Sequence, residues 1–303
     1  MQLFFKDRPG SAKHHLFWLI AAICLTSGCE EAFIDPFNND SKYFTVYGFL
    51  DESKNFQVGA TQDVRVIAVT RNAENIDSPS SPQADLDGRV FLTDISLEQT
   101  RELTHRLAEI QPGEFGHIFS TRIFIQPGRR YRLEIVREDG ITATAETTIP
   151  NTSSILVDQT SPLQAGNEIT QDILLAGASN IWSADMVYHI SGGGCFNSTR
   201  YIIPYGRQGN STEQGWALSV NITEDLAQIQ SQLQSTNLTV CAMGIRAKVM
   251  DDQWVLPDGE LNLEEISLPE NLTNVENGYG FFGAAGLFQS DWALDPALEA
   301  LLN

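Results

Sequence analysis

The stretch Asn274–Gly286, NVENGYGFFGAAG, decides how the last part of the chain is expected to fold. Within it, Gly278, Gly280 and Gly283 have the spacing G-x-G-x-x-G, which in dinucleotide-binding proteins follows a strand and opens a helix. The sequence ends at Asn303, too soon after the third glycine to complete a βαβ unit of about 30 residues. The two phenylalanines before that glycine would also fill the space that a pyrophosphate needs. We therefore interpret the glycine spacing as a coincidence.

The same residues instead predict a tight turn that leads into a buried strand. Asn277-Gly278 supplies the positive φ that such a turn needs. The small residues allow another backbone to approach closely, and three aromatic residues supply core: Tyr279, Phe281 and Phe282. We expect the turn over NVENGYG and the strand over GFFGAAGLF (280–288).

The rest of residues 151–303 predicts a second β-rich domain with one or two short helices. The best helix is Thr223–Ser235, with Thr223 as its cap and an apolar face of Leu226, Ile229 and Leu233. A short helix is expected from Asp295. The expected strands are DILLAGA (172–178), DMVYHISG (185–192), RYIIPYG (200–206), WALSVNIT (216–223) and LTVCAMGIRAKVM (238–250).

Residues 41–150 predict an immunoglobulin-like or transthyretin-like β-sandwich. About seven short segments of alternating polarity are separated by turn residues at near-regular spacing. They include RELTHRL (101–107) and STRIFI (120–125) as single strands. A third expected strand turns Tyr131, Leu133 and Ile135 inward, and Pro150 ends the last strand because proline cannot donate to a ladder.

The first residues have the pattern of an export signal. Three basic residues precede the short apolar run Leu16–Leu25, and Ser27-Gly28-Cys29 follows. This order predicts a lipoprotein signal over residues 1–28, with Cys29 acylated; the alternative is a plain secretory signal with an incidental cysteine. Residues 29–40 then predict an acidic tether.

The composition is strongly acidic. The chain has 19 Lys and Arg against 39 Asp and Glu, a formal net charge of −20. Such a chain repels phosphate backbones, which excludes nucleic acid as a partner. A net negative charge of this size keeps a protein soluble, which is the simplest explanation for it. A calcium requirement is a minor alternative.

Two cysteines remain after the signal and the lipid site. Cys195 and Cys241 form a disulfide candidate in an exported protein. Zinc is the competing use, although neither C-x-x-C nor a histidine pair accompanies them.

Aromatic residues in the second half are weak candidates for a ligand or partner site. Trp and Tyr are typical of protein interfaces and of sugar platforms, but they are equally common in cores. Exposed side chains would favour ligand capture, and buried ones would favour a scaffold. The candidates are Trp182, Tyr188, Tyr201, Tyr205, Trp216 and Trp254.

No catalytic motif stands out, so we expect a protein that is not an enzyme, without a cofactor or a metal. His105, His117 and His189 lack metal-binding spacing, and neither a G-x-S-x-G elbow nor a phosphate loop occurs. The glycine-rich SGGGC (191–195) reads as a structural loop.

Four features together resemble a known family. They are Cys29, the strand VYGFL (46–50), the ending TTIP (147–150) and the late motif that includes Asn277, Gly278, Gly280, Phe281, Phe282 and Gly283. The chain resembles an uncharacterised bacterial outer-membrane lipoprotein family, a domain of unknown function often encoded beside TonB-dependent receptors. The resemblance implies a lipid-anchored protein of the outer membrane, on either face, with a receptor barrel as partner. It supplies no catalytic or binding residues.

Three functions follow as hypotheses. The first is an accessory substrate-binding or gating subunit of a TonB-dependent transporter. The second is a structural or adhesive surface scaffold. The third, which nothing in the sequence requires, is a hydrolase.

Overall fold

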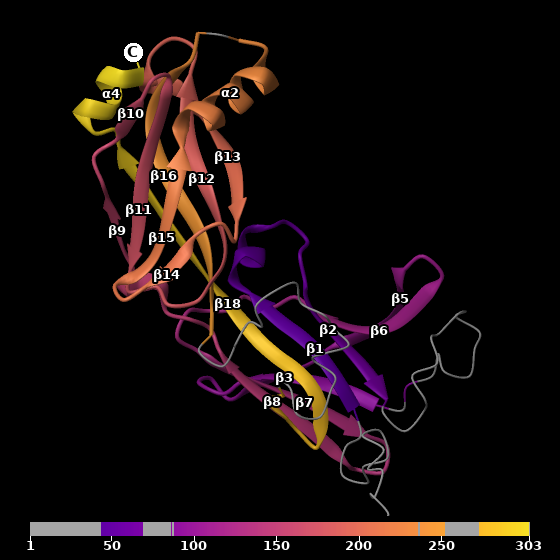
Figure 1. Ribbon diagram of the computed structural model, residues 1–303. Coiled ribbons are helices and arrows are strands. Elements are labelled where there is room, and N and C mark those ends of the chain that lie inside the picture. The colour runs from indigo at the N-terminus through magenta and orange to yellow at the C-terminus, as the bar shows by residue number, and fades with distance from the viewer. Residues whose placement is uncertain (1–43, 69–85, 87, 236, 252–272, 303) are drawn as a thin grey trace, which may run out of the picture. The chain divides into compact units, whose positions relative to one another are not determined.

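Strands make up most of the protein in the computed structural model, which describes residues 44–68, 86, 88–235, 237–251 and 273–302 (Figure 1). Within these residues the strands form one eight-stranded sheet and two five-stranded sheets. The described part of the chain also has two short α-helices: α2 (Ile222–Leu233) and α4 (Pro296–Leu302). In the same residues, three 3-10 turns occur: η1 (Glu52–Phe56), η3 (Thr152–Ser154) and η4 (Cys195–Asn197).

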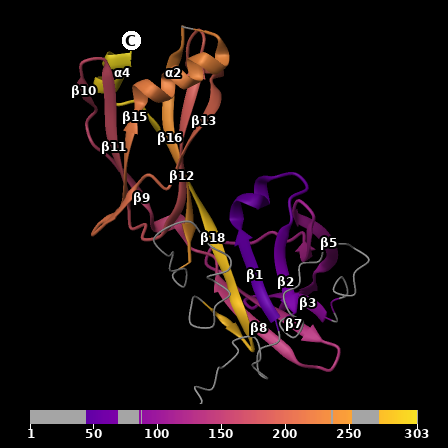
Figure 2. The ribbon, with the colours of Figure 1, turned by 45° about the vertical axis from the view of Figure 1, so that its right-hand side comes forward.

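The eight-stranded sheet contains strands from both halves of the sequence, in the order β13-β12-β16-β18-β1-β2-β6-β5. Four come from the second half: β13 (Thr199–Gly206), β12 (Ile181–Ser191), β16 (Thr239–Met250) and β18 (Gly278–Ala293). The other four are β1 (Phe44–Asp51), β2 (Gln62–Ala68), β6 (Glu114–Thr121) and β5 (Thr104–Gln111). The two groups meet where β1 pairs in parallel with β18, and both views show these strands side by side (Figure 2).

Each five-stranded sheet belongs mainly to one half. The first contains β17 (Val275–Glu276), β8 (Thr142–Thr148), β7 (Arg130–Arg137), β3 (Gly88–Asp94) and β4 (Gln99–Glu102), in that order. The second contains β10 (Leu163–Ala165), β11 (Glu168–Ala176), β15 (Gly215–Asn221) and β14 (Asn210–Thr212), and β9 (Leu156–Gln159) also pairs with β11.

Two hydrophobic cores fill the space between sheets. The first joins β1, β2 and β6 to β3, β7 and β8, with Tyr131, Leu133 and Ile135 buried as expected. The second joins β12 and β16 to β11 and β15. This confirms a mainly β fold, with a β-sandwich followed by a β-rich part that has two short helices. Strand β18 contributes Phe282 to the first core and Phe288 to the second. The domain boundary at residue 150 stays a prediction.

The opening stretch forms the expected turn and strand. Asn277 has φ 55° and separates β17 from β18, whose residues through Gly286 are all buried. The side chain of Asn274 links the two sides of the turn, since its Nδ2 donates to Phe282 O (2.7 Å) and its Oδ1 accepts from Phe282 N (2.9 Å). Gly278, Gly280 and Gly283 thus lie in a strand and not in a strand-to-helix loop.

Both helices form where they were expected, with one correction. The cap of α2 is Asn221, whose Oδ1 accepts from Glu224 N at 3.2 Å. The prediction of Thr223 was wrong, because its hydroxyl instead accepts from Ile169 N (2.9 Å). Helix α4 follows Asp295, whose Oδ1 accepts from Ala297 N at 2.7 Å.

Two expected strands of the first half were also wrong in their limits. The segment 101–107 divides at Leu103, whose buried side chain marks the crossing from β4 in one sheet to β5 in another. The segment 120–125 is strand only to Thr121. Its last residue, Ile125, is held by Asn55, whose side chain bonds both Ile125 N (3.1 Å) and Ile125 O (2.6 Å) in place of a ladder.

Candidate functional site

A groove of about 740 Å³ lies where β13, β16 and β18 meet the turns η1 and η3. It receives residues from distant parts of the sequence. Turn η1 and the residue after it supply Glu52, Ser53, Phe56 and Gln57; the η3 region supplies Thr152, Ser153 and Ile155; the strands supply Arg200, Arg246, Leu287, Phe288 and Gln289.

Two side chains fix the turns against β18 at Leu287. Glu52 Oε2 accepts from Leu287 N at 2.7 Å, and Thr152 Oγ1 donates to Leu287 O at 3.1 Å. Glu52 is buried, and burial raises the pKa of its carboxyl; the charge of Asp51 adds to this, and the Leu287 hydrogen bond opposes it. Both walls of the groove are thus bonded to one residue of its floor.

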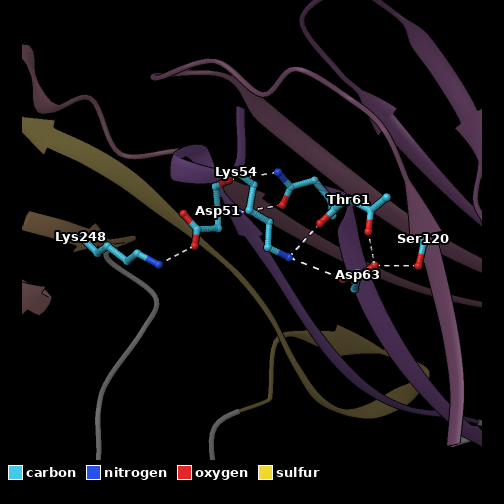
Figure 3. A network of polar contacts seen from close by, with 7 residues as sticks. Asp51, Lys54, Thr61, Asp63, Ser120 and Lys248 are labelled. Atoms are coloured by element: carbon cyan, nitrogen blue, oxygen red, sulfur yellow. Dashed lines mark hydrogen bonds and ion pairs between the residues drawn. The ribbon is translucent and has the colours of Figure 1, made fainter. Parts of the chain in front are cut away.

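A polar network also links the residues at η1 to β16 and β2 (Figure 3). Lys248 Nζ on β16 donates to Asp51 Oδ2 at 2.7 Å, and Asp51 exchanges two backbone hydrogen bonds with the side chain of Gln62. Burial alone would raise the pKa of Asp51, but the hydrogen bonds from Lys248 and Ser53 bring it below its ordinary value. This network makes η1 a fixed wall of the groove.

The second part of the network secures the start of β2. Lys54 Nζ donates to Thr61 O at 2.8 Å and lies 3.6 Å from Asp63 Oδ2. Asp63 Oδ1 also accepts from Thr61 Oγ1 (2.8 Å) and Ser120 Oγ (2.6 Å), as Figure 3 shows. Side chains therefore link η1 to the start of β2 and to β6.

Arg200 and Arg246 give the groove its positive charge. Neither arginine makes an ion pair within 4 Å among the residues that the structure describes, and the buried Nε of Arg246 has no hydrogen-bond partner there. Asp185 stands opposite Arg246 in the β12–β16 ladder; burial raises the pKa of Asp185, and Arg246 and Lys248 oppose that rise. Both arginines thus keep hydrogen-bonding capacity at the groove.

Three of the aromatic candidates are core residues. Tyr188, Tyr205 and Trp216 are buried in the second core, so the ligand interpretation is withdrawn for them. Tyr188 Oη donates to Asp225 Oδ2 at 2.5 Å, and Tyr205 Oη lies 3.0 Å from both oxygens of the same carboxylate. Burial raises the pKa of both tyrosines, and the negative charge of Asp225 adds to it. They therefore act as structural hydrogen-bond donors.

Asp225→Asn is expected to gain stability relative to the parent protein as the pH rises. Burial raises the pKa of Asp225 above its ordinary 3.8, against the hydrogen bonds from Tyr188 and Tyr205. The stabilising contribution of this carboxyl is full below pH 3.8 and is lost as the pH rises through the folded-state pKa. Urea unfolding of both proteins from pH 3.5 to 7 measures the difference, expected to be on the order of 1 kcal/mol. A difference that is flat with pH, or of opposite slope, would contradict the prediction.

The other aromatic candidates do not gather into a platform. Trp182 is half-buried beneath the guanidinium of Arg207, 3.8 Å from its ring centre. Tyr201 is half-buried against the second core. Trp254 lies outside the described residues. The sequence interpretation missed Arg200 and Arg246, because an outward strand position does not reveal which distant turn it faces.

The structure places Cys195 and Cys241 in a disulfide, with their Cα atoms 5.3 Å apart. It links η4 to β16 beside the glycine-rich loop. Ser191 of that loop donates through its hydroxyl to Gly194 O at 2.6 Å. The SGGGC segment is thus held by local hydrogen bonds and a covalent link.

Two histidines that looked unrelated in sequence come together across the β5–β6 hairpin. His105 Nε2 lies 2.9 Å from His117 Nδ1, and burial lowers the pKa of His105. The spacing of these histidines in the sequence does not reveal this contact, because the ladder places residues of neighbouring strands side by side. Among the described residues no cluster of three or more metal-binding side chains occurs.

The proposed lipid site lies elsewhere in the chain. Cys29, the signal over residues 1–28 and the tether over residues 29–40 fall outside the described residues. Within those residues, neither helix has the length and apolar character that crossing a membrane requires.

Comparison with solved structures gives distant likenesses. No family model and no curated protein matches the chain. A pullulanase from Anoxybacillus sp. LM18-11, solved with maltotriose, is similar at 12% identity over 68% of this chain and 24% of its own, with a TM-score of 0.20. The FN1–FN3 domains of chicken CNTN1 are similar at 11% identity over 69% of this chain and 61% of theirs, with a TM-score of 0.25. This chain thus spans about a quarter of the pullulanase, and neither likeness bears on function.

Proposed function

We propose that this chain is a non-catalytic binding subunit that works with a TonB-dependent receptor at the outer membrane. The groove carries the proposal, since its walls are fixed to β18 while Arg200 and Arg246 keep hydrogen-bonding capacity for a ligand. A rigid groove with a few convergent polar groups is the usual form of a small-molecule site.

The location rests on the sequence. Acylation of Cys29 would anchor the chain, and residues 29–40 would carry the folded part away from the lipid. The resemblance to lipoproteins encoded beside such receptors supplies the partner. Either face of the outer membrane fits this arrangement.

The absence of catalysis is part of the proposal. The described residues that line the groove include one carboxylate, Glu52, and neither histidine nor cysteine. The Glu52 carboxylate already accepts a backbone hydrogen bond. These lining residues favour binding over catalysis, because acid–base and nucleophilic catalysis need a second catalytic side chain in a fixed position.

A structural or adhesive scaffold is the second candidate function. The burial of Tyr188, Tyr205 and Trp216 favours it, because these side chains stabilise the second core and present no surface for a ligand. In this alternative the groove binds no ligand and is only a surface feature of the scaffold.

Affinity purification of the full chain, tagged after α4, from gently solubilised outer membrane tests the partner. We expect a receptor barrel in about equal amount, identified by mass spectrometry. The matched control carries residues 1–40 on an unrelated soluble domain, and it should not retain the barrel. A chain that purifies alone, or a barrel retained equally by the control, would overturn the accessory role and leave the scaffold.

A further inference from the structure

We propose that the groove binds the carboxylate of a small organic ligand, with Arg200 and Arg246 as its cationic contacts. This inference rests on the proposed binding function and names the chemistry of its ligand.

The first argument is the state of the two arginines. Several lysines and arginines of the described residues pair with a carboxylate, as Lys248 does with Asp51 at 2.7 Å. Arg200 and Arg246 instead face a groove in a chain of net charge −20 without an ion pair among the described residues. Guanidinium groups match planar carboxylates through two parallel N–H bonds. An anionic group is therefore the ligand that satisfies them.

The second argument selects a singly charged anion. Glu52 lines the same groove, and Asp185 stands across the ladder from Arg246. Together with the acidic body, these carboxylates repel a group with two negative charges more than a group with one. The surroundings therefore favour a carboxylate over a phosphate.

The third argument selects an organic ligand over a bare ion. Phe56 is 69% exposed at the groove, which leaves its ring free to cover an apolar or sugar face. Gln57, Gln289 and Ser153 add amide and hydroxyl groups that bond neutral polar atoms. A volume of about 740 Å³ accommodates a small organic molecule.

Saturation-transfer NMR on the full chain in detergent tests the inference with three matched pairs of probes. The acids are benzoate, D-glucuronate and N-acetylglycine, and the neutral partners are benzamide, D-glucose and N-acetylglycinamide. Inorganic phosphate serves as a competitor. We expect at least one acid to bind more tightly than its neutral partner, with phosphate a poor competitor.

Variants assign that preference to the groove. Arg246→Gln and Arg200→Gln are each expected to weaken acid binding about tenfold and to leave neutral probes unchanged. Arg101→Gln, which removes an exposed charge on β4, is the matched control and should have no effect. Thermal unfolding of each variant shows whether it is folded.

The outcomes separate the two proposals. Neutral probes that bind as well as acids, with no effect of either groove arginine, would overturn the carboxylate inference and keep a binding function. Phosphate that displaces the acids and binds more tightly would also overturn it. Binding of no probe would count against both the inference and the groove as a ligand site. A preference for acids that persists in both folded groove variants would place it elsewhere on the chain.

Discussion

The Gly280→Ala protein is expected to lose most or all of its folded structure. Gly280 has φ 85°, a conformation that costs an alanine about 1–2 kcal/mol. A Cβ atom there would lie 2.1 Å from Val46 O, an atom of the paired strand that has no free side-chain end to rotate away. This clash is relieved only if β1 moves away from β18. The two halves of the eight-stranded sheet join at this pair of strands. We expect a loss of more than about 4 kcal/mol, against a usual total of 5–15 kcal/mol.

Urea unfolding followed by circular dichroism measures this loss. Gly193→Ala is the control, because Gly193 has no positive φ and a Cβ atom there meets nothing within 4 Å. It should unfold within about 0.5 kcal/mol of the parent. A Gly280→Ala protein that is equally stable would show that β1 and β18 do not approach as closely as described.

Local patterns predicted the parts of the fold that depend on neighbours in sequence. The Asn277 turn, the buried strand after it and the inward alternation of Tyr131 each follow from a few adjacent residues. Helix α4 after Asp295 is of the same kind. In these cases the backbone preference and the side-chain polarity of neighbouring residues predict the same local structure.

Non-local pairing explains what the sequence did not predict. The parallel contact of β1 with β18 joins residues more than 200 positions apart, and no periodicity within either strand specifies its partner. The same holds for the groove, where Glu52 accepts a hydrogen bond from Leu287 and lines the same surface as Arg246. The crossing at Leu103 was missed because an alternating segment looks alike whether it stays in one sheet or moves to a second.

Lys248→Met is expected to destabilise the protein by about 3 kcal/mol at pH 7, because it leaves the buried carboxylate of Asp51 without its cation. Lys54→Met, at a pair that is 3.6 Å apart and about one-third exposed, should cost about 1 kcal/mol or less. A combined Asp51→Asn and Lys248→Met protein should recover part of the loss, since no buried charge remains.

The pH dependence distinguishes a charge effect from lost packing. The pKa of Asp51 is lowered in the folded state, so the pair stabilises fully above the ordinary value of 3.8 and loses this contribution as the pH falls through the folded-state pKa. In Lys248→Met, burial acts on Asp51 without the opposing cation, so the stability of the variant falls as the pH rises. Both effects make the difference between parent and variant shrink on acidification: the variant's contribution changes above 3.8, and the parent's changes below it. Urea titrations from pH 3 to 7 measure it, and a difference that stays constant would assign the loss to the packing of the lysine stem.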